Sequence, residues 1–150
     1  MVMMASNNYL GLTSHPKVLE AAIRAVREYG AGAGSVPLLA GTMSIHRRLE
    51  ERLAEFKGCE DAVVFATGYS TNLGCLSGLL RPGDLVVNDI LNHASIVDGC
   101  KMSGATVKVY PHGDLQALEK ILARSDGQHQ GKLVAVDGVF SMDGDIAPLP

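Results

Sequence analysis

The sequence is poor in cysteine, carries no excess of positive charge and contains no long apolar run. Its three cysteines are widely spaced and form no Cys-x-x-Cys pair, so neither a disulfide framework nor a zinc site is indicated. A net charge of −3 gives no reason to expect nucleic acid or an anionic membrane as a partner. No segment approaches a membrane span, and the start, MVMMA, lacks the basic flank of a secretory signal. We therefore expect a cytoplasmic globular protein with reduced thiols and without nucleic-acid or membrane partners.

Several motifs of nucleotide, hydrolase and metal sites are also missing. No Gly-Lys-Ser/Thr follows a glycine-rich turn, which argues against a P-loop. The sequence also has no Gly-x-Ser-x-Gly motif, which argues against a serine hydrolase. The glycine run at residues 30–41 follows a predicted helix rather than a strand and lacks the dinucleotide spacing. His93, Asp98 and His112 have no known ligand spacing, so no metal is expected.

Glycine, by contrast, is abundant, with 17 residues that stand mostly between periodic segments. Apolar spacing predicts one helix from Ser14 and Pro16 to Gly30, and a second helix from Ser44 to Gly58. From residue 62 short apolar runs alternate with helical patterns, and this alternation predicts βαβ units in a parallel sheet covered by helices on both faces. The predicted strands are residues 62–67, 85–89, 106–111 and 132–140, and the predicted helices are 70–80, 93–104 and 114–125, the last capped by Asp114.

Ligands of such sheets bind beyond the carboxyl ends of the strands, so the residues after each predicted strand are candidates for a site. Turns also need polar residues, which leaves a purely local role open for each of them. The candidates are Gly68 and Tyr69 in TGYSTN, Asn88, Asp89, Asn92 and His93, His112 and Asp114, and Asp137, Ser141 and Asp143.

TGYSTN, residues 67–72, joins a predicted strand to a predicted helix. Gly68 allows the turn, and free amides at a helix start favour an anion, above all a phosphate. An ordinary cap by Ser70 or Thr71 explains the segment equally well.

His93 follows the next strand, with Ser95 and Asp98 nearby. An imidazole there could stack on a planar cofactor or move a proton. Capping or packing at a helix start is the alternative.

Six segments of the chain carry a further signal when they are taken in order. They are NNYLGLTSHP, AGTMSIHRRLEERLAEF, ATGYSTNLG, LNHASIVDG, SGA and DGVFSMDGDIAPLP. In this order they resemble the α-oxoamine synthase family of pyridoxal-phosphate-dependent enzymes of fold type I, which includes 8-amino-7-oxononanoate synthases, glycine C-acetyltransferases, 5-aminolevulinate synthases and serine palmitoyltransferases. The resemblance covers essentially all 150 residues.

The resemblance implies a partial large domain of the fold type I transferases at residues 45–150, preceded by an amino-terminal segment at 1–44 with a helix and the glycine-rich loop. It also implies pyridoxal 5'-phosphate as cofactor, with the amides of Gly68 and Tyr69 on its phosphate and Ser141 near its phenolic oxygen. His93 would stack on the pyridine ring and act as a catalytic residue.

Two further site residues are less specific. Asn7 matches a substrate-contact position, although turn chemistry in SNNY explains it as well. Asp137 belongs to the cofactor region, although an acidic residue at a strand end often accepts turn amides.

The activity implied by the resemblance is the condensation of an amino acid with an acyl-CoA or acyl-carrier-protein thioester to an α-amino ketone, usually with decarboxylation. The loop at residues 30–41 would reach the site of a partner subunit, so a homodimer is expected for the full-length protein. Two alternatives stay open: another fold type I enzyme such as an aminotransferase, and a catalytically silent subunit that binds a partner.

The sequence departs from the family at two points. Pro37 stands where the family commonly has arginine, so the amino acid and acyl donor stay open. The family's Schiff-base lysine, ring-nitrogen aspartate and substrate-binding arginine lie beyond this chain, and none of its six lysines stands in the lysine context of the family. We therefore expect an amino-terminal part of a longer enzyme, inactive alone, with Leu149 and Pro150 in a turn before a further helix.

Overall fold

The computed structural model describes residues 5–149, and the chain divides into two compact units between Val63 and Val64. A turn is expected at Leu149 and Pro150, but Pro150 lies outside the described residues. The assignment of residues 1–44 and 45–150 to two domains stays a prediction.

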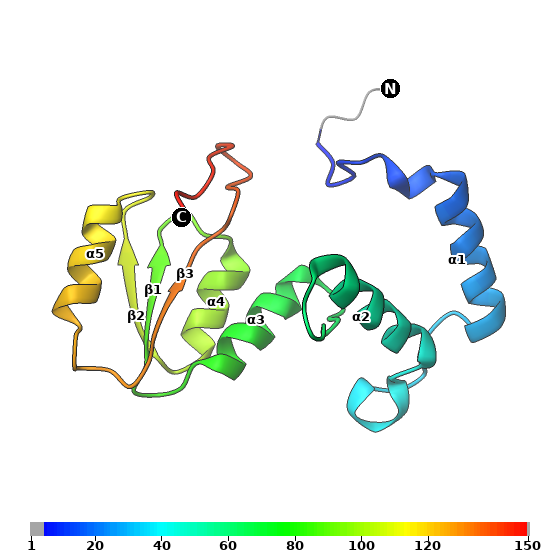
Figure 1. Cartoon of the computed structure of the whole chain (residues 1–150), viewed down its shortest axis with the longest axis horizontal. Helices are drawn as coiled ribbons and strands as arrows, with labels where there is room; N and C mark the ends of the chain where they lie inside the picture. Colours follow the sequence, from blue (N-terminus) through cyan, green and yellow to red (C-terminus); the bar gives the residue numbers. More distant parts are fainter. Residues whose placement is uncertain (1–4, 150) are drawn as a thin grey trace. The chain divides into compact units, whose positions relative to one another are not determined.

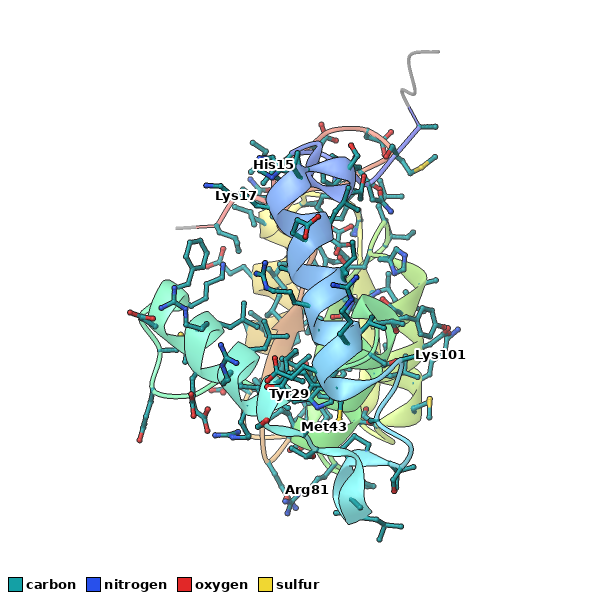
Figure 2. All side chains as sticks on the ribbon, turned by 90° about the vertical axis from the view of Figure 1, so that its right-hand side faces the viewer. His15, Lys17, Tyr29, Met43, Arg81 and Lys101 are labelled. Atoms are coloured by element: carbon teal, nitrogen blue, oxygen red, sulfur yellow. The ribbon has the colours of Figure 1, made fainter. Side chains whose placement is uncertain are left out.

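The first unit consists of helices whose ends are specified locally. His15 caps α1 (Pro16–Tyr29) because its Nδ1 atom accepts the Lys17 amide at 3.2 Å, and Gly30 ends the helix with φ +83°. Figure 2 shows His15 and Lys17 at one end of α1 and Tyr29 at the other. The helix predicted from Ser44 to Gly58 is confirmed as α2 (Ser44–Lys57). The unit also contains two short turns, η1 (Leu12–Ser14) and η2 (Pro37–Gly41).

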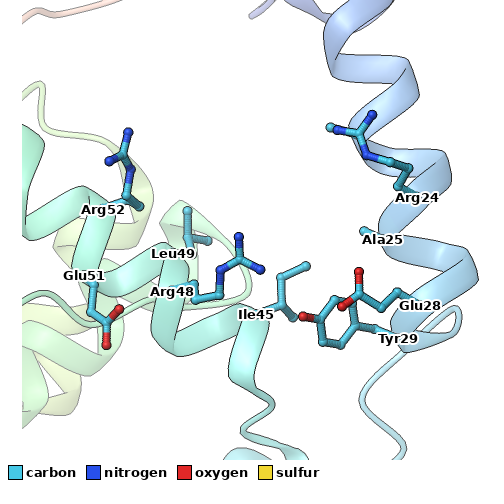
Figure 3. Close-up of a pocket in the computed structure, with 10 residues that line it drawn as sticks. Arg24, Ala25, Glu28, Tyr29, Ile45, Arg48, Leu49, Glu51 and Arg52 are labelled. Carbon is cyan, nitrogen blue, oxygen red and sulfur yellow. The ribbon is translucent and has the colours of Figure 1, made fainter.

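The first unit buries little of its apolar surface. Among its described residues only Gly41 and Ala54 are buried. The apolar face of α1 is solvent-accessible, with exposed fractions from 43% at Ile23 to 56% at Val26. Within this unit α1 and α2 border an open groove of about 610 Å³ (Figure 3). Its lining mixes cations such as Arg24 and Arg48 with anions such as Glu28.

The second unit contains a parallel sheet in the order β2-β1-β3, which confirms the predicted fold class. The central strand β1 (Leu85–Asp89) is buried along its whole length and pairs with both β2 (Thr106–Tyr110) and β3 (Lys132–Ala135). The helices α3 (Gly68–Leu79) and α4 (Ala94–Met102) cover one face, and α5 (Leu115–Arg124) covers the other (Figure 1).

Alternate side chains of β1 form two separate cores. Val86 packs with Leu76 of α3 and with Ile96 and Cys100 of α4. On the opposite face, Leu85, Val87 and Tyr110 pack against α5 through Ala117, Leu118, Ile121 and Leu122. This two-sided burial explains why β1 begins with the continuous apolar run at residues 85–87.

The strand predicted at residues 62–67 is wrong, since this segment is irregular and Val63 is 74% exposed. A strand exists only through its ladder, and β1, β2 and β3 form theirs with one another. The strand predicted at 132–140 is correct only as far as Ala135, because the chain then turns into a hairpin in which Val139 pairs antiparallel with Ile146.

The strand order creates a topological switch point at the carboxyl end of the sheet. The chain leaves β1 through α4 on one face and leaves β2 through α5 on the other, so β2 and β3 lie on opposite sides of β1. Loops that follow strands on either side of such a reversal diverge, and ligands bind between them. The loops after β1 and β3 contain His93 and Ser141.

Candidate functional site

The amino terminus of α3 presents free backbone donors. Thr67 caps the helix: its Oγ1 atom accepts the Ser70 amide and its carbonyl accepts the Thr71 amide, both at 3.0 Å. The amides of Gly68 and Tyr69 donate no hydrogen bond within the described part of the chain. A Cβ atom built on Gly68 would meet nothing within 4 Å, so an anion has room to reach both donors. The cap is therefore Thr67, rather than Ser70 or Thr71, and it leaves the anion site open.

Tyr69 connects this turn to the next helix. Its hydroxyl donates to the Asp98 carboxylate of α4, and this hydrogen bond raises the pKa of the Tyr69 phenol above its ordinary value. The Tyr69 ring meets the His93 ring edge to face, with centroids 6.4 Å apart and an interplanar angle of 77°. The two aromatic rings therefore lie side by side at the carboxyl end of the sheet.

His93 serves as a helix cap. Its Nδ1 atom accepts the Ser95 amide at 3.2 Å and contacts the Ser95 hydroxyl at 2.6 Å, which caps α4. Since Nδ1 acts as an acceptor, this arrangement places the ring proton on Nε2. Asn72 of α3 donates to the same Ser95 hydroxyl at 2.9 Å. Capping thus fixes the orientation of an imidazole that stays exposed, which is compatible with stacking on a planar ligand.

A buried amide network joins the ends of β1 and β3. Asn92 donates from Nδ2 to Asn88 Oδ1 and to the Ala135 carbonyl, both at 2.7 Å, and its Oδ1 accepts the Asp137 amide at 2.8 Å. Asp137 in turn accepts the His93 amide at 2.7 Å. Asp137 therefore acts as an acceptor for a turn amide, the alternative that the sequence left open. The sequence placed Asn92 at a strand end but could not identify its partners.

Ser141 lies in the hairpin that follows β3 and is exposed. The hairpin is closed by hydrogen bonds from the Phe140 amide to the Asp145 carbonyl at 2.8 Å and from the Gly144 amide to the Phe140 carbonyl at 2.7 Å. Within the described residues, Ser141 makes no hydrogen bond to Tyr69 or His93, whereas the rings of Tyr69 and His93 meet each other.

Asn7 belongs to the first unit, and its Oδ1 atom accepts the Tyr9 hydroxyl at 3.2 Å. This contact is the local turn chemistry that SNNY allows. Within residues 5–149, none of the helices has the length and hydrophobicity of a membrane span. The same residues contain no cluster of three acidic, histidine or cysteine side chains placed to bind a metal ion.

Comparison with known proteins gives consistent matches. The family model for aminotransferase class I and II matches residues 1–150. The chain is 54% identical over 148 residues to the 8-amino-7-oxononanoate synthase of Bacillus pumilus, covering 99% of this chain and 38% of that protein. It is also 54% identical over 149 residues to the enzyme of the same name from Geobacter sulfurreducens, again covering 99% and 38%.

A solved structure agrees with these matches. The S. paucimobilis serine palmitoyltransferase with a bound PLP–myriocin aldimine is 41% identical and superimposes with a TM-score of 0.91, covering 95% of this chain and 35% of that one. The chain thus spans about 38% of the length of the curated relatives that it matches.

Proposed function

Because the chain belongs to the aminotransferase class I and II family, we propose that its protein is a pyridoxal-phosphate-dependent acyltransferase that condenses an amino acid with an acyl-CoA or acyl-carrier-protein thioester to an α-amino ketone, with loss of carbon dioxide. The observation that carries the proposal is the pair of unbonded amides at Gly68 and Tyr69, which open α3 at the carboxyl end of a parallel sheet. Similarity to 8-amino-7-oxononanoate synthases supports the choice of reaction.

The residues present fit the cofactor. The two free amides and the positive end of the α3 dipole suit a phosphate group, and the space above Gly68 admits it. When bound, pyridoxal phosphate supplies an electron sink for negative charge at the α-carbon of the amino acid. His93 would offer its ring face to the pyridine, held by the Ser95 cap, and Ser141 would offer its hydroxyl to the phenolic oxygen.

The remaining assignments belong to the same proposal. Asn7 would contact the substrate, and the loop at residues 30–41 would reach the site of a second copy in a homodimer. The Schiff-base lysine is assigned to none of the six lysines of this chain. A cytoplasmic location follows from the sequence-based expectation of reduced thiols.

The proposed phosphate site, formed by the free amides of Gly68 and Tyr69, can be tested by removing the N–H group of Gly68. Gly68 is the first residue of α3 and its φ is not in the left-handed region, so proline fits there and removes the N–H donor without interrupting the helix. Thr67, with φ −148° and ψ 159°, already has the extended conformation that a following proline requires. Gly68→Ala is the matched control, because it keeps the N–H donor and its Cβ atom meets open space.

We expect Gly68→Pro to weaken binding of pyridoxal phosphate by about tenfold, the effect of losing one hydrogen bond to a charged group. Gly68→Ala should stay within about twofold of the unchanged chain. Binding is followed by absorbance titration and by the amide NMR signal of Tyr69, with pyridoxal, which lacks the phosphate, as a second control. Equal affinities of the two variants, or equal affinities for pyridoxal and its phosphate, would contradict the proposed phosphate-binding role of the Gly68 and Tyr69 amides.

A further inference from the structure

Asp89 at the end of β1 gathers hydrogen bonds from two loops. Its side chain is 1% exposed, and it accepts the Leu91 amide at 2.9 Å and the Gly113 amide at 3.1 Å, while His112 Nδ1 lies 3.0 Å from Oδ1. Burial alone would raise the pKa of Asp89, but these hydrogen bonds outweigh it and hold the pKa below its ordinary value. Asp89 is therefore a buried carboxylate at neutral pH.

His112 extends this arrangement to a third loop. Its other ring nitrogen, Nε2, lies 3.2 Å from Asp145 Oδ2, and its ring meets the Phe140 ring edge to face with centroids 4.4 Å apart. A neutral imidazole has one N–H, so one of its nitrogens would direct a lone pair at a carboxylate, whereas an imidazolium donates to both. The hydrogen bond to Asp89 raises the pKa of His112 most, burial opposes this, and Asp145 raises it further.

The residues that His112 contacts in the third loop are those that close the hairpin. The Phe140 amide donates to the Asp145 carbonyl at 2.8 Å, and Ser141 follows Phe140 directly in the chain. The buried end of β1 is thus connected, through one imidazole, to the base of the hairpin that carries Ser141.

We propose that His112 is a positioning residue, which bridges Asp89 to Asp145 and so holds the Ser141 hairpin in place for the cofactor. The role toward the cofactor rests on the proposed function, whereas the bridge itself does not. The charged groups that face the imidazole are Asp89 from β1 and Asp145 from the hairpin. The Tyr110 phenol of β2 lies beside Asp89, and burial first and the Asp89 charge second raise its pKa, so it stays neutral. The bridge is complete below the raised pKa of His112 and is lost as the pH rises through it.

The experiment compares two charge removals on the same hairpin of the 150-residue chain. Asp145→Asn weakens the bridge, and Asp143→Asn is the matched control, since Asp143 is exposed and makes no hydrogen bond or ion pair among the described residues. NMR titration of the His112 ring and the hydrogen-exchange protection of the Phe140 and Gly144 amides are measured in both variants. A third variant, His112→Gln, tests the pH dependence.

We expect Asp145→Asn to lower the His112 midpoint and to reduce both protection factors about two- to fivefold, as for loss of a partly exposed ion pair. Asp143→Asn should change neither quantity. In the unchanged chain the protection factors should fall as the pH rises through the His112 midpoint, and His112→Gln should abolish this dependence. Equal protection in the two aspartate variants would overturn the bridge.

Binding of pyridoxal phosphate separates the two parts of the proposal. If the hairpin has the proposed role, Asp145→Asn weakens binding about two- to fivefold relative to Asp143→Asn. A loosened hairpin with unchanged affinity would overturn the positioning role and leave a structural bridge. If the unchanged chain binds no pyridoxal phosphate, the proposed phosphate site at Gly68 and Tyr69 and the role of the hairpin toward the cofactor both fail, while the exchange data still decide the bridge.

Discussion

The two units of the chain form their helices by different means. In the unit that ends at Val63, α1 and α2 have well-defined caps but almost no buried side chains, and Leu19 is 47% exposed. In the unit that begins at Val64, α3, α4 and α5 pack on a sheet whose residues Leu85, Val86 and Val87 are fully buried. A helix that buries nothing depends on its local sequence, and isolated helices as short as α1, with 14 residues, are marginal in water.

This difference between the two units affects how accurately each of them can hold the side chains of a functional site. Functional side chains are held accurately when packed elements and hydrogen bonds orient them. His93, Asp137 and His112 are all oriented in this way by the second unit, whereas the Asn7 side chain accepts a hydrogen bond from the nearby Tyr9 in a local turn. The comparison therefore predicts that mutations will act cooperatively in one unit and locally in the other.

The largest contrast is expected for the same deletion made in each unit. Leu85→Ala removes a fully buried side chain of β1 and should lower the free energy of unfolding by about 2–5 kcal/mol. Leu19→Ala, on the exposed face of α1, should change it by less than about 0.5 kcal/mol. Urea denaturation followed by the near-ultraviolet signal of the tyrosines measures both. Similar losses in the two variants would show that α1 is packed as firmly as β1.

The next effect concerns acid stability of the second unit. Because the pKa of Asp89 is lower in the folded chain than its ordinary value of about 3.9, its stabilisation is fully present above that value and is lost as the pH falls through the folded pKa. Asp89→Asn should cost about 1–2 kcal/mol at pH 7 and should flatten this acid dependence.

Unfolding free energies measured between pH 3 and pH 7 test this prediction, with Asp61→Asn in the first unit as the control. Asp61 is an exposed carboxylate that lies outside the sheet. An acid profile that Asp89→Asn leaves unchanged would contradict the assigned role of this carboxylate.

The smallest effect compares two caps. His15 caps α1 and Asp114 caps α5, and each side chain accepts one backbone amide. Loss of either cap should cost about 0.5–1 kcal/mol locally. His15→Ala should therefore fray α1 visibly in amide chemical shifts, whereas Asp114→Ala should leave α5 helical, because Leu118 and Leu122 still pack on the sheet. Equal fraying of both helices would remove the distinction between the units.

Local signals in the sequence were sufficient for most elements. The stops at Gly30 and Gly58, the Asp114 cap and the apolar run of β1 each lie where they were predicted, because each depends on conformations or burial that a few residues encode. The segment at residues 62–67 shows the limit of such signals. Its apolar composition fits a strand, but a strand also needs a ladder, which no local pattern contains.

The sequence by itself determined the helix ends, the parallel α/β fold class, the family resemblance and the positions of the polar residues after each strand. Only the tertiary structure decided which of these residues meet: Tyr69 with His93, Asn92 with Asp137, and His112 with Asp89 and Asp145. The reason is physical. Caps and apolar periodicity act over a few neighbouring residues, whereas these contacts join loops 23 to 45 positions apart, and the strand order β2-β1-β3 sets which loops are neighbours.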